Sequence, residues 1–193
     1  MYTVTSTSMA RRLAEIYGTQ AYETGVGFKF VGPKMIETGA VIGGEESGGF
    51  GFGMHIPERD GLASGLFLLD LWLSRGRQAS EVLAELQALA GPSHYNRTDI
   101  RFAREGYDRV KADTLARLGD QAPESLAGRA VVERKKLDTG DGFKFYRDDG
   151  SWLLIRFSGT EALLRIYTES RSPEDVEAML DEGRRIVAQP VAT

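Results

Sequence analysis

The sequence predicts an α/β protein made of two units, a mixed-sheet α/β unit and a smaller α+β unit with an antiparallel sheet. In the first half of the chain, strand-type segments at residues 2–5, 20–23 and 40–42 alternate with helical segments at 9–17, 62–74 and 80–90. Such alternation indicates a parallel or mixed sheet. The Gly91-Pro92 pair is a strong helix stop, and polar residues follow it. We therefore predict a first unit at 1–91, a linker at 92–106 and a second unit at 107–193.

The second half of the chain predicts antiparallel strands flanked by helices. A helix is expected at 107–118, and strands are expected at 131–132, 143–147, 151–156 and 162–168. Asp148-Asp149-Gly150 is typical of a hairpin turn between two of these strands. The last helix has the clearest start, because Ser172 is a good N-cap, Pro173 suits the first helical position and Asp175 completes a capping-box pattern.

Composition excludes several functional classes. The 193 residues carry a net charge of −4 and no cysteine, which argues against a nucleic-acid surface and excludes disulfides and thiolate metal sites. Two histidines are too few for a histidine-built zinc site. The chain starts without the features of a secretory signal, and its longest apolar run, 66–73, is interrupted by Asp70 and too short to span a bilayer. We expect a cytoplasmic protein with no membrane contact, in which that run is a buried helix.

The glycine-rich segment 42–53 carries the first candidate site. It surrounds Glu45, Glu46 and Ser47, and His55 and Arg59 follow within a few residues. Glycine lets a backbone approach a ligand closely, carboxylates and a hydroxyl suit sugar hydroxyls, and the basic pair suits a phosphate. Neighbours in an extended strand point opposite ways, so one glutamate should face the ligand and the other should be structural. The alternative is a flexible surface loop with solvated charges.

The second candidate site is the segment 156–161, Arg-Phe-Ser-Gly-Thr-Glu, which lies between two predicted strands with Arg165 on the second. The N–H groups and hydroxyls of such a turn can point at one anion, and arginine binds phosphate through two parallel hydrogen bonds. The alternative is a plain hairpin turn whose arginines serve solubility.

Three other motifs fail. Residues 27–34 have the glycine spacing of a P-loop, but Pro33 stands where the lysine must be. Residues 138–143 lack the alternating oxygen ligands of a calcium loop. Ser47 lies in no Gly-x-Ser-x-Gly elbow and has no obvious paired base. No metal ligand is predicted.

Taken together, these segments resemble the C-terminal half of the α-D-phosphohexomutase superfamily, the phosphoglucomutase/phosphomannomutase enzymes. Residues 44–48 resemble the sugar-binding loop of the family's third domain, and residues 156–161 resemble the phosphate-binding loop of its fourth. Residues 26–29, 55–61 and 148–152 also match, and all of these segments occur in the family's order. The resemblance covers nearly the whole chain.

The resemblance implies roles residue by residue. Glu45, rather than Glu46, and Ser47 match residues that bind sugar hydroxyls. Arg59 matches a basic position near the transferred phosphoryl group, with His55 and Lys29 nearby. The clamp on the non-transferred phosphate corresponds to Arg156, Ser158, Gly159, Thr160 and Arg165. Phe157 and Ala162 stand where the family often has prolines, which would stiffen the loop.

The resemblance also shows what this sequence lacks. The family's phosphoserine loop, of Thr-Ala-Ser-His-Asn-Pro type, and its Mg²⁺ loop, of Asp-Gly-Asp-x-Asp-Arg type, do not occur here. It implies a chain that opens inside domain three, so the first unit is expected to be a truncated mixed α/β/α sheet domain. Phosphoryl transfer needs a phosphate donor and a metal to neutralise charge. We therefore expect no cofactor in this chain and no turnover by it, with Mg²⁺ and glucose 1,6-bisphosphate belonging to the full-length enzyme.

The leading hypothesis is a C-terminal part of an enzyme that interconverts hexose 1-phosphate and 6-phosphate. Its expected partners are a hexose phosphate, the missing N-terminal half and, through the truncated domain, a second copy of the chain. The alternative is a non-catalytic sugar-phosphate-binding or regulatory module, and a third reading is a folded remnant that binds nothing. Glucose and mannose remain equally open as substrates.

Overall fold

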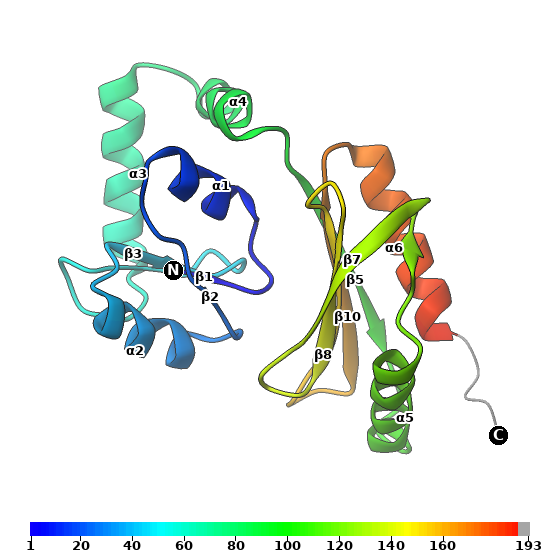
Figure 1. The fold of residues 1–193 in the computed structure, drawn as a ribbon. Coiled ribbons are helices and arrows are strands. Elements are labelled where there is room, and N and C mark those ends of the chain that lie inside the picture. Colours follow the sequence, from blue (N-terminus) through cyan, green and yellow to red (C-terminus); the bar gives the residue numbers. More distant parts are fainter. Residues whose placement is uncertain (189–193) are drawn as a thin grey trace. The chain divides into compact units, whose positions relative to one another are not determined.

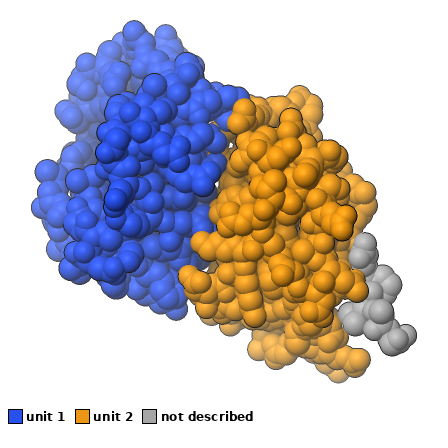
Figure 2. Space-filling view, in the orientation of Figure 1, with its two compact units in different colours: residues 1–92 blue, residues 93–193 orange. Residues whose placement is uncertain are grey.

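The computed structural model describes residues 1–188, which divide between Pro92 and Ser93 into two compact units, here called unit 1 and unit 2 (Figures 1 and 2). Unit 1 contains, in chain order, β1 (Tyr2–Thr3), α1 (Met9–Ile16), β2 (Glu23–Thr24), α2 (Phe28–Thr38), β3 (Ile42–Gly44), β4 (Phe50–Phe52), α3 (Gly61–Arg75) and α4 (Ala79–Ala90). Its strands lie in the order β2-β1-β3-β4. β1 is parallel to β2 and β3, and β4 closes an antiparallel hairpin with β3, so the mixed α/β sheet predicted from the sequence is confirmed.

Helix α2 was not predicted, and it explains part of the glycine-rich segment. The helix starts after Gly27, whose φ of 117° favours glycine, and it accommodates Pro33 in its interior. A Cβ on Gly43 of β3 would lie 2.6 Å from Val31, and one on Gly51 of β4 would lie 2.8 Å from Phe28. The β3–β4 hairpin therefore needs glycine at these two positions because α2 packs directly against it.

Unit 1 has a small core, and the expectation of a buried helix at 66–73 is wrong. One buried cluster consists of Phe28, Val31 and Met35 on α2, and Val4, Met9, Ala14 and Ala90 are also buried. Helix α3, in contrast, has no buried residue; Leu62 is 84% exposed and Trp72 is 57% exposed. Apolar composition shows that a helix can be buried, but its burial requires another element to cover it. Among residues 1–188, no helix combines the length and the apolar character that crossing a membrane would require.

Unit 2 is an antiparallel sheet with two helices. It contains β5 (His94–Arg101), α5 (Tyr107–Asp120), β6 (Ser125–Leu126), β7 (Arg129–Lys136), β8 (Gly142–Arg147), β9 (Trp152–Phe157), β10 (Leu163–Ser170) and α6 (Pro173–Ala188). The strands lie in the order β5-β10-β9-β8-β7-β6, so the predicted antiparallel sheet is confirmed. The predicted linker at 92–106 needs correction, because β5 occupies much of it and pairs with β10 along its whole length.

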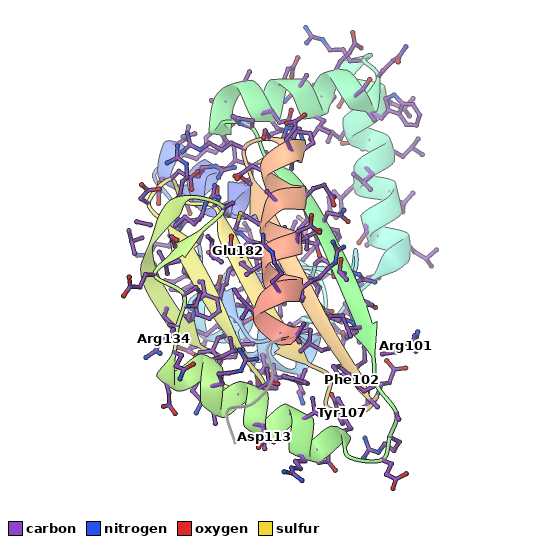
Figure 3. All side chains as sticks on the ribbon, turned by 90° about the vertical axis from the view of Figure 1, so that its right-hand side faces the viewer. Arg101, Phe102, Tyr107, Asp113, Arg134 and Glu182 are labelled. Carbon is purple, nitrogen blue, oxygen red and sulfur yellow. The ribbon has the colours of Figure 1, made fainter. Side chains whose placement is uncertain are left out.

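One face of the unit 2 sheet carries the main core. Figure 3 shows α5 and α6 in front of this face, and both pack on it. Alternate residues of the central strands, such as Leu153, Ile155 and Ile166, are fully buried among apolar side chains of the helices, as the period of two in a strand requires. This core gives the strand ends, and the loops between them, a rigid base.

The start of α6 differs from the expected capping box. Ser172 does cap the helix, because its hydroxyl accepts a hydrogen bond from the Asp175 amide at 3.2 Å. The Asp175 carboxylate, however, binds Arg147 and Ser170. The buried Arg147 guanidinium is a charged donor, and its hydrogen bond to this carboxylate is stronger than the hydrogen bond that a backbone amide at the helix N-terminus would give.

Candidate functional site

The first candidate site lies at the carboxyl end of β3, where the chain turns through residues 45–49 into β4. The Glu45 amide donates to the Gly49 carbonyl at 2.9 Å, and the Gly48 amide donates to the Glu45 carbonyl at 3.0 Å. Gly48 has a φ of 89° and open space on its Cβ side, so glycine is required there by the turn itself. These two hydrogen bonds close the turn between β3 and β4.

Glu45 ties three segments of unit 1 together. Its side chain is buried; one carboxylate oxygen accepts the Gly27 amide at 3.0 Å, and the other lies 3.4 Å from the Arg59 guanidinium. Glu46 is half-buried and Ser47 is exposed at the loop tip. Each carboxylate oxygen of Glu45 has a second lone pair, so the carboxylate can still accept a hydrogen bond from a ligand hydroxyl. Its selection over Glu46 as the sugar ligand stays a prediction.

The three basic residues predicted near the transferred phosphate are placed differently. Arg59 reaches Glu45 and lies over the Phe28 ring at 5.7 Å. Lys29, in the first turn of α2, lies over the Phe30 ring at 5.0 Å. In the described part of the chain, neither Lys29 nor His55 forms a hydrogen bond or ion pair with Glu45. The structure thus brings Arg59 alone into the Glu45 network.

His55 is paired with Asp60, the N-cap of α3. Its Nε2 lies 3.0 Å from the Asp60 carboxylate, whose other oxygen accepts the Ala63 amide at 2.9 Å. The hydrogen bond from Ala63, followed by that from His55, lowers the pKa of Asp60. This arrangement favours a helix-capping role for Asp60. The His55 ring is half exposed and contacts the capping carboxylate.

The second candidate site is the loop between β9 and β10, residues 158–162. The Ser158 amide donates to the Leu163 carbonyl at 2.7 Å and closes the loop at its base. The Ser158 hydroxyl oxygen accepts the amides of Thr160 and Glu161 at 3.3 and 3.2 Å. Since this oxygen accepts two N–H groups, its own proton can be donated to the Thr160 hydroxyl, which lies 3.5 Å away, or to a ligand. The Gly159 amide makes no hydrogen bond within residues 1–188, and Gly159 and Thr160 are exposed.

Each of the two predicted phosphate-binding arginines has an acidic neighbour. Arg156 donates from Nε to the buried Asp141 at 2.9 Å, and its two terminal nitrogens form no hydrogen bond among the described residues. Arg165 lies 3.6 Å from both Glu161 and Asp99. The carboxylate of Asp141 holds the Arg156 side chain by one edge, which leaves the fork of terminal N–H groups for a ligand.

Sequence reasoning missed two residues at this loop. The Tyr107 hydroxyl lies 3.0 Å from the carbonyls of both Ser158 and Leu163, and Asp141 orients Arg156. Tyr107 is 51 residues from Ser158 in the sequence, and no local motif marks it. Asp141 lies in the segment rejected as a calcium loop, so its sequence context pointed to a different role.

Two cavities of unit 1 lie away from the candidate loop after β3. One, of about 510 Å³, is lined mainly by apolar residues and reaches His55; the other, of about 550 Å³, lies between α1 and the start of β3. Neither is lined by Glu45 or Ser47. Among residues 1–188, no group of three or more histidine, aspartate or glutamate side chains is arranged so that it could hold a metal ion.

Comparison with known proteins shows the family of the chain. Residues 1–89 match the family described as phosphoglucomutase/phosphomannomutase, alpha/beta/alpha domain III, and residues 103–186 match phosphoglucomutase/phosphomannomutase, C-terminal domain. The chain belongs to the phosphoglucomutase/phosphomannomutase family. The two matches fall in units 1 and 2 respectively, and β5 lies in the segment between them.

Relatives in this family are longer than this chain. A phosphoglucomutase/phosphomannomutase from Thermococcus kodakarensis is 29% identical over 187 residues, covering 97% of this chain and 37% of the relative. A phosphoglucomutase from Rhizobium radiobacter is 29% identical, covering 88% of this chain and 34% of the relative. A crystal structure described as that of a phosphomannomutase from Thermus thermophilus is 34% identical with a TM-score of 0.72, covering 97% of this chain and 36% of its own. The chain therefore spans little more than a third of the family members it matches.

Proposed function

We propose that this chain is the part of a phosphohexomutase that binds the retained phosphate and the hydroxyl groups of a hexose phosphate. In this proposal unit 2 binds the phosphate that stays on the sugar, and unit 1 binds the sugar hydroxyls. Membership of the family supports the reaction class, the exchange of phosphate between two positions of a hexose. The residues proposed to act are those of the loops after β3 and β9.

The observation that carries the proposal is the arrangement of donors around Ser158. Among the residues described, the Gly159 amide and the terminal nitrogens of Arg156 have no acceptor, and the Ser158 hydroxyl has the Thr160 hydroxyl at 3.5 Å as its one possible acceptor. A phosphate presents several acceptor oxygens to such a set. Arg165 adds a second positive charge from β10, because its guanidinium lies next to this loop at Glu161. A plain hairpin turn would not need this concentration of donors.

Unit 1 is proposed to bind the hydroxyl groups of the sugar. The buried Glu45 carboxylate already accepts two donors and keeps lone pairs for a hydroxyl, and the exposed Ser47 can donate or accept at the same loop. Arg59, held beside Glu45, is proposed to lie near the transferred phosphate, with Lys29 and His55 as further cations in the same unit. A guanidinium stabilises the charge of a phosphoryl group during transfer.

We further propose that the 193-residue chain alone has no mutase turnover. Phosphoryl transfer needs a donor residue in line with the acceptor hydroxyl, and the serine motif that supplies it in the family does not occur in this sequence. Pure chain is expected to leave glucose 1-phosphate unconverted in a coupled assay for glucose 6-phosphate. Turnover by pure material would overturn this part of the proposal.

The binding proposal is tested by amide NMR with glucose 1,6-bisphosphate. The wild-type chain is expected to shift its Ser158, Gly159 and Thr160 resonances, whereas Arg156→Gln should weaken binding by about tenfold or more, as expected for a lost charge-assisted hydrogen bond. Arg129→Gln is the matched control, since it removes the same charge from an exposed side chain at the opposite end of the sheet. No shift at the loop, or equal weakening by both variants, would overturn the proposal.

A second experiment separates an enzyme part from a regulatory module. Adding the remaining domains of a family member as a separate polypeptide is expected to restore turnover, which should again depend on Arg156. Binding of the bisphosphate without restored turnover would favour the alternative, a module that senses hexose phosphates.

A further inference from the structure

A single buried hydroxyl holds both ends of the phosphate-binding loop proposed above. Tyr107 is the first residue of α5, and Figure 3 shows it beside Phe102 near one end of the sheet. Its hydroxyl lies 3.0 Å from the Ser158 carbonyl and 3.0 Å from the Leu163 carbonyl. These two residues flank the loop, so one side chain from another element spans the loop's base.

Tyr107 can act here only as a hydrogen-bond donor. Its side chain is buried, with the rings of Phe102 and Phe157 at 6.1 and 6.0 Å. Burial raises the pKa of its phenol further above neutrality, so the proton stays on the oxygen. That proton is shared between the two carbonyls that face it, because a phenol has only one.

The Ser158 carbonyl depends on this contact. In the described part of the chain it accepts no other hydrogen bond, whereas the Leu163 carbonyl also accepts the Ser158 amide. Ser158 in turn carries the hydroxyl that organises the amides of Thr160 and Glu161. Rotation of the Ser158 peptide would therefore move the donors that are proposed to meet the phosphate.

We propose that Tyr107 is a positioning residue for anion binding by residues 158–160, an inference that rests on the proposed function of this loop. The family prolines that stiffen such loops are replaced here by Phe157 and Ala162. The Tyr107 hydroxyl supplies the restraint from outside the loop by fixing the carbonyls at both of its ends. Losing that restraint costs affinity, because the free loop must then be ordered when the anion binds.

The test compares Tyr107→Phe with Thr168→Val. The first keeps the packed ring and removes the hydroxyl; the second removes another buried hydroxyl of unit 2, which donates to the Trp152 carbonyl at 2.8 Å away from the loop. Both variants should lose similar stability, whereas only Tyr107→Phe should move the free amide resonances of Gly159 to Glu161. It should also weaken the binding of inorganic phosphate by about fivefold to tenfold.

The outcomes distinguish the two proposals. If the wild-type chain binds phosphate and Tyr107→Phe binds it equally well, the positioning role is overturned and the proposed function stands. If the wild-type loop resonances do not respond to phosphate, the proposed function fails and the inference fails with it. Should Tyr107→Phe not fold, site-specific 3-fluorotyrosine at this position keeps the packing and makes the hydroxyl a stronger donor. It should tighten binding, and unchanged affinity would again overturn the inference.

Discussion

Arg147→Met in unit 2 is expected to destabilise the fold in a pH-dependent way. The guanidinium of Arg147 is completely buried and lies 3.0 Å from Asp149 and 3.0 Å from Asp175. It also donates to the Leu126 carbonyl at 3.3 Å. Methionine fills a similar volume without charge, so the variant removes the buried cation from both partly buried carboxylates, although Asp149 keeps an ion pair with the half-exposed Arg129 at 3.4 Å.

The magnitude follows from Asp149. Burial opposes ionisation of this carboxyl, but hydrogen bonds from Arg147 and Ser151 outweigh burial and lower its pKa from 3.8 to about 2. A change of that size corresponds to about 2.5 kcal/mol. Removing one partner of a buried pair costs about 3–5 kcal/mol in other proteins. We therefore expect Arg147→Met to lose about 3 kcal/mol of unfolding free energy near neutral pH.

The sign of the pH dependence follows from the same pKa. Because the folded-state pKa of Asp149 is depressed, its contribution is fully present above its ordinary pKa and is lost as the pH falls through about 2. The pKa of Asp175 is also lowered, since hydrogen bonds from Arg147 and Ser170 outweigh the opposing effect of burial. Wild-type stability should therefore fall between about pH 4 and pH 2, and that of Arg147→Met should fall much less over this range.

Urea unfolding followed by tryptophan fluorescence measures this effect. Trp152 is completely buried in unit 2, whereas Trp72 is exposed in unit 1, so a Trp72→Phe background makes Trp152 the sole reporter. Arg171→Gln is the control, because it removes an exposed arginine that, among residues 1–188, binds only the Asp149 carbonyl. An unchanged midpoint in Arg147→Met, or a decline in acid as steep as that of the wild type, would refute the reasoning.

Two further predictions concern the backbone and the surface. Ala127 has a φ of 46° and is the sole non-glycine residue among 1–188 with positive φ, so Ala127→Gly should raise the unfolding free energy by about 0.5 kcal/mol; a lower midpoint in urea would contradict this. We also expect the chain to self-associate through α3, where Leu66 and Leu73 are 68% and 74% exposed. The double change to glutamate should leave stability within about 0.5 kcal/mol and yield a monomer in light scattering, and a monodisperse wild-type monomer would contradict the expectation.

Local sequence patterns predicted the elements whose residues signal their own structure. The helices α3 and α4 and the strands β8, β9 and β10 appear within a residue or two of their expected positions, because hydrophobic period, caps and turn residues act over a few positions. Two of the elements that the sequence did not predict, α2 and β5, were missed for the same reason. Helix α2 contains a proline, and β5 is a polar strand whose neighbour β10 is distant in sequence. Both are stabilised by packing or pairing partners that a local pattern does not contain.

The candidate site divides in the same way. The sequence by itself determined which loops are candidate sites, since the run of glycines around Glu45 and the Ser158-Gly159-Thr160 turn are unusual in composition and order. Only the tertiary structure decided what each side chain contacts. It placed Glu45 in a buried network with Arg59, left α3 uncovered, and brought Tyr107 and Asp141 to a loop far away in sequence. Hydrogen bonds and burial depend on the distances between elements of the folded chain. The order of residues constrains only the distances between residues that are neighbours in the sequence.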